Sequence, residues 1–183
     1  DAKFILEQAY KENNSIVFQH DRVQIVAVGR LVEQKGFDRL LQACKELVGA
    51  GYKFQLHIIG MGEQYQMLEK YINENDLQSY VFLHGYQSNP YVYMKQCDIL
   101  ICSSHAEGYS LVIAEAMILG LAIVTTSCSG PCELIDNGKY GILVDNSVDG
   151  IYQGLKFVLS DPILLEKYKA LAAERGSIFD VDE

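Results

Sequence analysis

The sequence has 183 residues, 49% of them hydrophobic, which is enough for one well-buried domain of ordinary size. A net charge of −9 without a dense Lys/Arg cluster argues against a nucleic-acid surface, because phosphate neutralisation needs a concentrated basic face. No apolar run approaches the roughly 20 residues that span a bilayer, and the charged start is unlike a secretory signal. Five scattered cysteines suit a reducing compartment better than a disulfide framework. We therefore expect a soluble, cytoplasmic protein.

The chain starts without a methionine and with a polar, helix-like segment, which we interpret as a helix and linker (residues 1–22) of a larger protein. From Val23 onward, short apolar runs rich in β-branched residues alternate with longer segments of helical period. This alternation predicts an α/β domain over residues 23–175, a Rossmann-like, doubly wound parallel sheet of about six strands, with a C-terminal tail at 176–183. The predicted strands are residues 23–28, 54–59, 81–83, 99–102, 122–125 and 141–144.

Helices are predicted between these strands. After the first strand, apolar residues from Phe37 to Val48 recur on one helical stripe, and Gly49 and Gly51 end it. The other predicted helices cover residues 63–74, 110–119, 147–159 and 162–175.

Four segments with candidate functional residues lie just after predicted strands. They are residues 29–36, 60–63, 103–115 and 127–133. In a parallel α/β sheet, ligands bind outside the carboxyl ends of the strands, where loops and helix N-termini gather. The sequence therefore predicts one ligand site along that edge.

The segment after the first strand carries two cations, Arg30 and Lys35, between Gly29 and Gly36. The two cations could hold a diphosphate between them, and the glycines allow close approach and a turn into the helix. Two solvated surface cations are the alternative that this segment leaves open.

A second turn reads Gly60-Met61-Gly62. It starts like a dinucleotide fingerprint but lacks the third glycine, so a tight strand-to-helix turn explains it equally well.

The segment from Glu107 to Glu115 is the most informative about function, and a glutamate stands at each end of it. Ser110 is the predicted N-cap of the helix that follows, and the free backbone N–H groups beside it form an anion site. Glu107 precedes that site, and Glu115 lies inside an otherwise apolar helix. A buried carboxylate is costly there unless it has a partner or a function. The two carboxylates could therefore flank a diphosphate and accept hydrogen bonds from hydroxyls at either end of the ligand. A loop charge and a helix residue with a local partner are the alternative.

No metal site is predicted. Cys128 and Cys132 lack a second Cys/His pair to complete a tetrahedral site, so we interpret them as small buried residues. A formal D-x-D motif at Asp180 and Asp182 falls within the last four residues, where fraying is the default.

Glu107 and Glu115, separated by seven residues, resemble the E-x7-E signature of the retaining group-1 glycosyltransferases, also called family 4. Further segments typical of that family follow in its expected order. They are Gly29-Arg30 with Lys35-Gly36, residues 59–63, His84-Gly85-Tyr86, Ser103-Ser104 and residues 138–144. The resemblance covers residues 23–144 and extends more loosely to the C-terminus. Met61 and Ser129 depart from the family pattern, which bears on donor identity more than on the class.

The resemblance implies the C-terminal, donor-binding half of a GT-B enzyme that transfers a sugar from a nucleoside diphosphate sugar with retention of configuration. It places Arg30 and Lys35 on the diphosphate, Glu107 on the sugar hydroxyls and Glu115 on the ribose. The base would lie near residues 84–86. The remaining implied donor-binding residues are Gly29, Gly60, Gly62, His84, Tyr86, Gly108, Tyr109, Ser110 and Leu111.

The resemblance also bears on cofactors and partners. Uridine diphosphate is the commonest donor nucleotide in bacterial members, and no metal or other cofactor is expected. A glycan or lipid-linked acceptor would be held by an absent N-terminal domain, through which the enzyme could sit peripherally at a membrane. The donor half alone should be inactive.

Two alternatives stay open from the residues. In a glycoside hydrolase, Glu107 and Glu115 would act as acid and nucleophile. A non-catalytic nucleotide-binding module is the other. Binding of a free nucleoside diphosphate distinguishes the hydrolase, because a hydrolase has no use for it.

Overall fold

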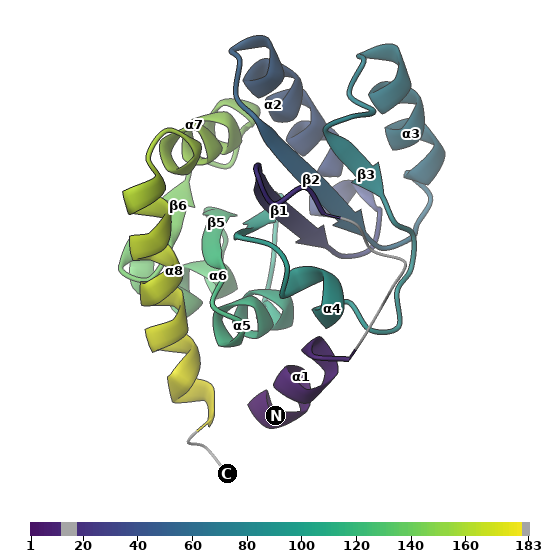
Figure 1. The fold of residues 1–183 in the computed structure, drawn as a ribbon. Helices are drawn as coiled ribbons and strands as arrows, with labels where there is room; N and C mark the ends of the chain where they lie inside the picture. Colours follow the sequence, from purple (N-terminus) through teal and green to yellow (C-terminus); the bar gives the residue numbers. More distant parts are fainter. Residues whose placement is uncertain (12–17, 181–183) are drawn as a thin grey trace.

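The computed structural model describes residues 1–11 and 18–180. Its centre is an all-parallel sheet of six strands in the order β3-β2-β1-β4-β5-β6 (Figure 1). The strands are β1 (Val23–Val28), β2 (Phe54–Ile59), β3 (Val81–Leu83), β4 (Ile99–Cys102), β5 (Ala122–Thr126) and β6 (Ile142–Val144). The predicted Rossmann-like, doubly wound sheet is confirmed, with β5 one residue longer and β6 one residue shorter than predicted.

Helices cover both faces of the sheet. The α-helices are α1 (Ala2–Ala9), α2 (Phe37–Gly49), α3 (Tyr65–Glu74), α4 (Tyr91–Met94), α5 (Leu111–Ile118), α6 (Ser129–Leu134), α7 (Val148–Leu159) and α8 (Pro162–Gly176). Three 3₁₀ turns, η1 (Glu33–Lys35), η2 (Asp136–Gly138) and η3 (Ser177–Asp180), complete the described elements. The longer predicted helices are present within two residues of their expected ends. Two short helices, α4 and α6, were not predicted, because one turn or slightly more shows no recognisable period.

Two hydrophobic cores lie on opposite faces of the sheet. One packs α2, α3 and α7 against the strands, and the other packs α4 and α5 against the opposite face (Figure 1). Leu40, Leu41 and Leu47, on the predicted stripe of α2, are completely buried in the first core. Each such side chain contributes roughly 1.5–3 kcal/mol through burial. The helices therefore fix the sheet, and the sheet fixes the loops at its carboxyl edge.

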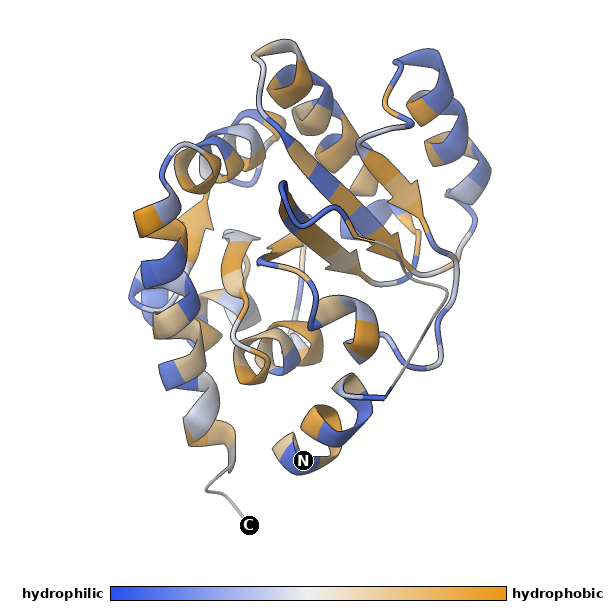
Figure 2. Cartoon of the chain, viewed as in Figure 1, coloured by the Kyte–Doolittle hydropathy of each residue, from blue (hydrophilic) through white to orange (hydrophobic). Residues whose placement is uncertain are grey.

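Polar residues interrupt the apolar strands β1 and β2, and Figure 2 shows blue breaks in the otherwise orange sheet. His57 Nε2 lies 2.7 Å from Gln24 Oε1, and His57 Nδ1 lies 2.8 Å from His84 Nε2. Gln24 in turn donates to Gln55 Oε1 at 3.1 Å. These contacts satisfy polar groups that would otherwise be costly to bury. Burial, and then the neighbouring His84, lowers the pKa of His57 to about 3.

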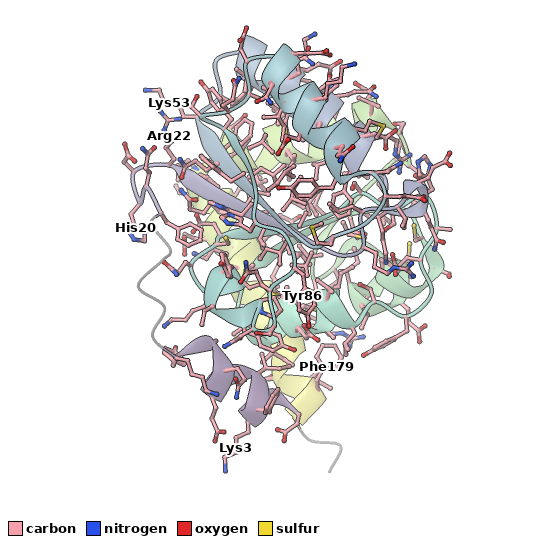
Figure 3. The ribbon with its side chains drawn as sticks, turned by 90° about the vertical axis from the view of Figure 1, so that its right-hand side faces the viewer. Lys3, His20, Arg22, Lys53, Tyr86 and Phe179 are labelled. Atoms are coloured by element: carbon pink, nitrogen blue, oxygen red, sulfur yellow. The ribbon has the colours of Figure 1, made fainter. Side chains whose placement is uncertain are left out.

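The sheet order reverses between β1 and β4, the central pair. The loops that leave these two strands turn to opposite faces, so their carboxyl ends open a crevice, the usual place for a ligand in this type of sheet. Arg22 and Lys53 precede the paired residues Val23 and Phe54, and they mark the amino ends in Figure 3. Tyr86, which follows β3, lies well away from them in the same view. The crevice therefore faces the side of Tyr86.

The first helix packs on the domain. It contacts α4, α5 and η3, which brings the start of the described chain close to its end (Figure 1). The predicted C-terminal tail begins with the last residue of α8 and continues into η3. Asp182 of the D-x-D motif lies outside the described residues. Within the described ranges, no helix combines the length and apolarity needed to cross a membrane.

Candidate functional site

The loop from β1 to α2 packs directly onto the end of β4. Gly36 has a φ of 67°, and a side chain there would collide with the carbonyl oxygen of Ser103. Only glycine combines this backbone conformation with so close an approach. The 3₁₀ turn η1 ends at Lys35, immediately before this contact. The glycine turn therefore delivers Lys35 to the β4 loop.

Lys35 and Glu107 form an ion pair across the crevice. The ammonium Nζ lies 3.0 Å from both carboxylate oxygens of Glu107, and Ser104 Oγ donates to Glu107 Oε2 at 2.8 Å. The side chains are 28% and 14% exposed, so the pair is partly shielded from water. A lysine has three N–H donors, which leaves one for a ligand. Lys35, the predicted phosphate ligand, is thus in direct contact with Glu107, the predicted ligand of the sugar hydroxyls.

The N-terminus of α5 lies beside this ion pair. Ser110 is the predicted N-cap, and its Oγ accepts a hydrogen bond from the Ile113 backbone N–H at 3.3 Å. The first turn of a helix presents further N–H groups and a partial positive charge to an anion. A cavity of about 240 Å³ joins the helix start to the ion pair. Its lining includes Lys35, Phe37, Ser104, Glu107, Tyr109, Ser110, Leu111 and Val112.

A second hollow, of about 330 Å³, adjoins this cavity, and Val28 lines both. Its other lining residues are Gly29, Arg30, Ile59, Gly60, Met61, Tyr86, Gln87 and Pro90. Tyr86 is 74% exposed and Met61 is 49% exposed, so an apolar, partly aromatic surface is open to a flat ligand. Arg30 is exposed in this hollow, whereas Lys35 lies in the cavity. The two predicted cations therefore face neighbouring parts of the site.

The glycines of the second turn bring two loops together. Gly60 has a φ of 148°, and a side chain on it would collide with the Gly29 carbonyl oxygen. A side chain on Gly62 would meet the backbone of Leu31. These glycines shape the floor of the second hollow by allowing the loops after β1 and β2 to touch.

The second glutamate of the signature is set apart from the first. Glu115 is 8% exposed and is not among the residues lining either hollow. Burial raises the pKa of Glu115, and a hydrogen bond with Tyr91 opposes that shift. Burial, and then the charge of Glu115 and the same hydrogen bond, raises the pKa of Tyr91 to about 12. Glu115 thus has a local partner, and the two glutamates do not face one cavity as a hydrolase pair would.

The imidazole of His84 is engaged inside the domain. Its Nε2 contacts His57 Nδ1, and its ring lies 5.0 Å from the ring of Tyr93. Because His57 Nε2 faces the side-chain amide oxygen Oε1 of Gln24, which only accepts, the consistent tautomers have His84 Nε2–H donating to His57 Nδ1. His84 therefore anchors the start of the loop that carries Tyr86.

The remaining predicted residues and Cys128 lie around the loop that follows β4. Gly108 has open space around its Cα, and Tyr109 is 68% exposed. Burial raises the pKa of the Cys128 thiol, whose Sγ donates to the Ser104 carbonyl oxygen at 3.5 Å. Among the described residues, no group of three His, Cys, Asp or Glu side chains is placed to hold a metal ion.

Three contacts escaped the sequence-based prediction of the site. Ser104 Oγ donates to Glu107, Tyr91 interacts with Glu115 and opposes the rise in its pKa that burial causes, and Thr126 Oγ1 donates to the Ser104 carbonyl oxygen at 2.7 Å. The Ser103-Ser104 motif indicates the family but not the contact that Ser104 makes. Tyr91 and Thr126 carried no signal, because their contacts depend on the packing of separate elements.

Comparison with known proteins identifies the family of the chain. Residues 10–175 match the family described as Glycosyl transferases group 1. A Campylobacter jejuni N-acetylgalactosamine-N,N'-diacetylbacillosaminyl-diphospho-undecaprenol 4-alpha-N-acetylgalactosaminyltransferase is 35% identical over 158 residues, 85% of this chain and 42% of that protein. The Staphylococcus aureus capsular polysaccharide biosynthesis glycosyltransferase CapM is 28% identical over 90% of this chain and 44% of its own length. The chain thus spans less than half the length of these curated relatives.

Solved structures show the same fold. A TarM variant from S. aureus, in complex with fondaparinux, alpha-GlcNAc-glycerol and UDP, superposes with a TM-score of 0.78 at 24% identity, over 90% of this chain and 34% of that one. Anabaena Alr3699/HepE, in complex with UDP and glucose, gives a TM-score of 0.73 at 21% identity, over 84% of this chain and 44% of that one. With its six-stranded sheet and the match over residues 10–175, the chain belongs to the group 1 glycosyltransferases.

Proposed function

We propose that this chain binds the nucleoside diphosphate sugar donor of a glycosyltransferase that retains anomeric configuration. The observation that carries the proposal is the Lys35–Glu107 ion pair beside the N-terminus of α5, in one cavity. A cation and a helix N-terminus suit a diphosphate, and a carboxylate suits sugar hydroxyls. The donor would thus lie with its phosphates between Lys35 and α5 and its sugar against Glu107.

The same groups account for leaving-group departure. As the glycosidic bond breaks, negative charge grows on the outer phosphate of the nucleoside diphosphate. Lys35 and the backbone N–H groups of the first turn of α5 would stabilise that charge, with Arg30 acting from the neighbouring hollow. Loss of one such donor typically lowers the rate by roughly 10²- to 10³-fold. We propose that these fixed groups serve in place of a divalent metal.

The second hollow would receive the nucleoside. Tyr86 and Met61 offer an apolar surface for the base, next to the proposed diphosphate position. Uridine is the base we favour, because the related TarM and Alr3699/HepE structures contain UDP. We assign Glu115 to the ribose, which requires the Tyr91 contact to open or to be shared with the ligand.

The acceptor is proposed to bind outside this chain. The curated relatives are more than twice as long as the part that this chain matches. We propose that the unmatched part holds a glycan or lipid-linked acceptor, and that the chain alone transfers no sugar. Transfer to a simple acceptor by the purified chain would contradict this part of the proposal.

Isothermal titration calorimetry with UDP tests the proposed donor site. Wild-type chain should bind UDP, and Lys35→Met should weaken the binding. Lys169→Met is a matched control, because Lys169 is also 28% exposed and pairs with a carboxylate, Asp98, at 3.2 Å. That control should bind UDP like wild type. Wild-type chain that binds no nucleoside diphosphate, with GDP and ADP as further arms, would refute the proposed function.

A further inference from the structure

Two consecutive serines follow β4, and each contacts one member of the ion pair. Ser103 Oγ donates to the backbone carbonyl of Lys35 at 2.9 Å, whereas Ser104 Oγ donates to the Glu107 carboxylate at 2.8 Å. Both serines are 2% exposed. Successive side chains of an extended segment point to opposite sides, which lets neighbouring serines reach different partners. The phosphate side and the sugar side of the site are thus tied to adjacent residues.

The backbone carbonyls of both serines accept hydrogen bonds from buried residues of other elements. Thr126 Oγ1, at the end of β5, donates to the Ser104 carbonyl oxygen at 2.7 Å, and Thr126 is completely buried. Arg39 Nη2, from α2, donates to the Ser103 carbonyl oxygen at 2.6 Å. Because these partners belong to a strand and a helix of the cores, the backbone from which both serine side chains project is held in place.

The hydrogen bonds divide the carboxylate of Glu107 into two unlike oxygens. Within the part of the chain that the structure describes, Oε2 accepts from Ser104 and Lys35, whereas Oε1 accepts from Lys35 alone. Each carboxylate oxygen has about two acceptor positions, so Oε2 is saturated and Oε1 has one position left. A donor hydroxyl would therefore find its acceptor at Oε1.

From this arrangement we infer that Ser104 is the positioning residue that aims Glu107 at the donor sugar, and that Ser103 positions Lys35 for the diphosphate. The inference rests on the proposed function and deepens it. Without the Ser104 hydroxyl, Glu107 would keep its ion pair with Lys35 but lose the contact that distinguishes its two oxygens. The affinity for the sugar part of the donor then falls, and the affinity for the bare diphosphate does not.

The experiment compares Ser104→Ala with Ser103→Ala, a matched pair in residue type, burial and position. Calorimetry gives the dissociation constants of each variant for UDP, UDP-glucose and UDP-N-acetylgalactosamine. Ser104→Ala should weaken the better-bound UDP-sugar about tenfold, the value of a hydrogen bond to a charged group, and should change UDP binding less than twofold. Ser103→Ala should weaken UDP and UDP-sugar by the same factor, because both carry the diphosphate.

Several results would overturn this inference. Equal losses of affinity for UDP and UDP-sugar in Ser104→Ala would show that Ser104 is merely structural. Wild type that binds UDP-sugar no more tightly than UDP would likewise contradict the inference. Thr126→Val keeps the shape of the side chain but removes the donor to Ser104. It should reproduce the Ser104→Ala pattern more weakly, and it replaces Ser104→Ala if thermal melts show that variant unfolded. Failure of wild type to bind any nucleoside diphosphate would instead refute the proposed function itself.

Discussion

The two hollows at the carboxyl edge differ in how they are built. The cavity beside α5 is charged. A hydrogen bond from Ser104, in the loop after β4, holds Glu107, and hydrogen bonds from β5 and α2 hold the backbone of that loop. The hollow around Tyr86 is mostly apolar, and its largest side chains are exposed. The difference teaches that the proposed phosphate and sugar contacts are preorganised, whereas the base would meet a less constrained surface. Preorganised contacts lose less entropy on binding and should carry more of the affinity.

The largest expected effect comes from Lys35. Among the described residues, Lys35 is the one side-chain cation that lines the charged cavity, so Lys35→Met should weaken the binding of UDP and UDP-sugar roughly 10- to 100-fold each. Calorimetry beside Lys169→Met gives the comparison. A loss of less than twofold would shift the main phosphate contact to Arg30 in the other hollow.

Glu107 and Glu115 should differ in what their loss affects. Glu107→Gln should weaken UDP-sugar but leave UDP nearly unchanged, because Glu107 is assigned to the sugar. Glu115→Gln should weaken both ligands by similar factors, because both carry the ribose. Each effect should be roughly 1.5–3 kcal/mol, the value of a charge-assisted contact. Dissociation constants are measured with a circular dichroism melt of each variant, and identical patterns for the two variants would contradict the assignment.

His57 and His84, which contact each other, lie beside the start of the loop that carries Tyr86. Burial lowers the pKa of His57 to about 3 and also lowers that of His84, which begins the loop of Tyr86. The unfolded chain therefore takes up more protons than the folded chain below about pH 6.5, and stability present above that pH is lost as the pH falls toward 3. For His57 the loss reaches at most about 2 kcal/mol at pH 5, at 1.4 kcal/mol per pH unit.

Urea unfolding at pH 7.5 and pH 5.0 measures this loss. Other groups also titrate, so the informative quantity is the difference between wild type and His57→Gln, whose pH dependence should be smaller. His105→Gln, at an exposed position, is the control and should follow wild type. A His57→Gln chain with the pH dependence of wild type would show that His57 is not the source.

Tyr86 should have a smaller effect than the charged residues. Tyr86→Ala should weaken UDP and UDP-sugar by the same factor, about fivefold, since stacking on an aromatic ring is worth roughly 1 kcal/mol at an exposed position. Tyr10→Ala, at a similarly exposed tyrosine directly after α1, should leave the affinity for both ligands unchanged. A larger loss of affinity in Tyr86→Ala than in Lys35→Met would show that the apolar hollow, not the charged cavity, contributes more to binding.

The smallest expected effect is that of a chelator. Excess EDTA should change the UDP dissociation constant less than twofold, because Lys35 and the N-terminus of α5 are proposed to hold the diphosphate directly. Complete loss of binding in EDTA, restored by Mg²⁺, would contradict this proposal.

The sequence predicted the sheet well, because each strand is a short β-branched run and each long helix has a clear apolar stripe. Lys35, Glu107 and Ser110 were also within reach, since each follows a central strand and the carboxyl ends of β1 and β4 meet. The Lys35–Glu107 pair joins residues 72 positions apart, and no local pattern announces it. Likewise, Tyr91 lies on a helix of four residues, too short for a periodic signal.

The buried polar network was also beyond prediction. Gln24, Gln55 and His57 look like ordinary polar positions of half-buried strands, but helices cover both faces of this sheet. Their partners become visible only when β1, β2 and β3 are placed side by side. The order of motifs in the sequence can therefore identify the family. Which side chains contact one another depends on the tertiary structure.

A crystal structure of the chain with UDP-glucose would test the central claim most directly. The account predicts the diphosphate within hydrogen-bonding distance of Lys35 Nζ and the first backbone N–H groups of α5, with a sugar hydroxyl on Glu107 Oε1 and the uracil beside Tyr86. A diphosphate bound at the Gly60–Gly62 turn, or a sugar remote from Glu107, would contradict it.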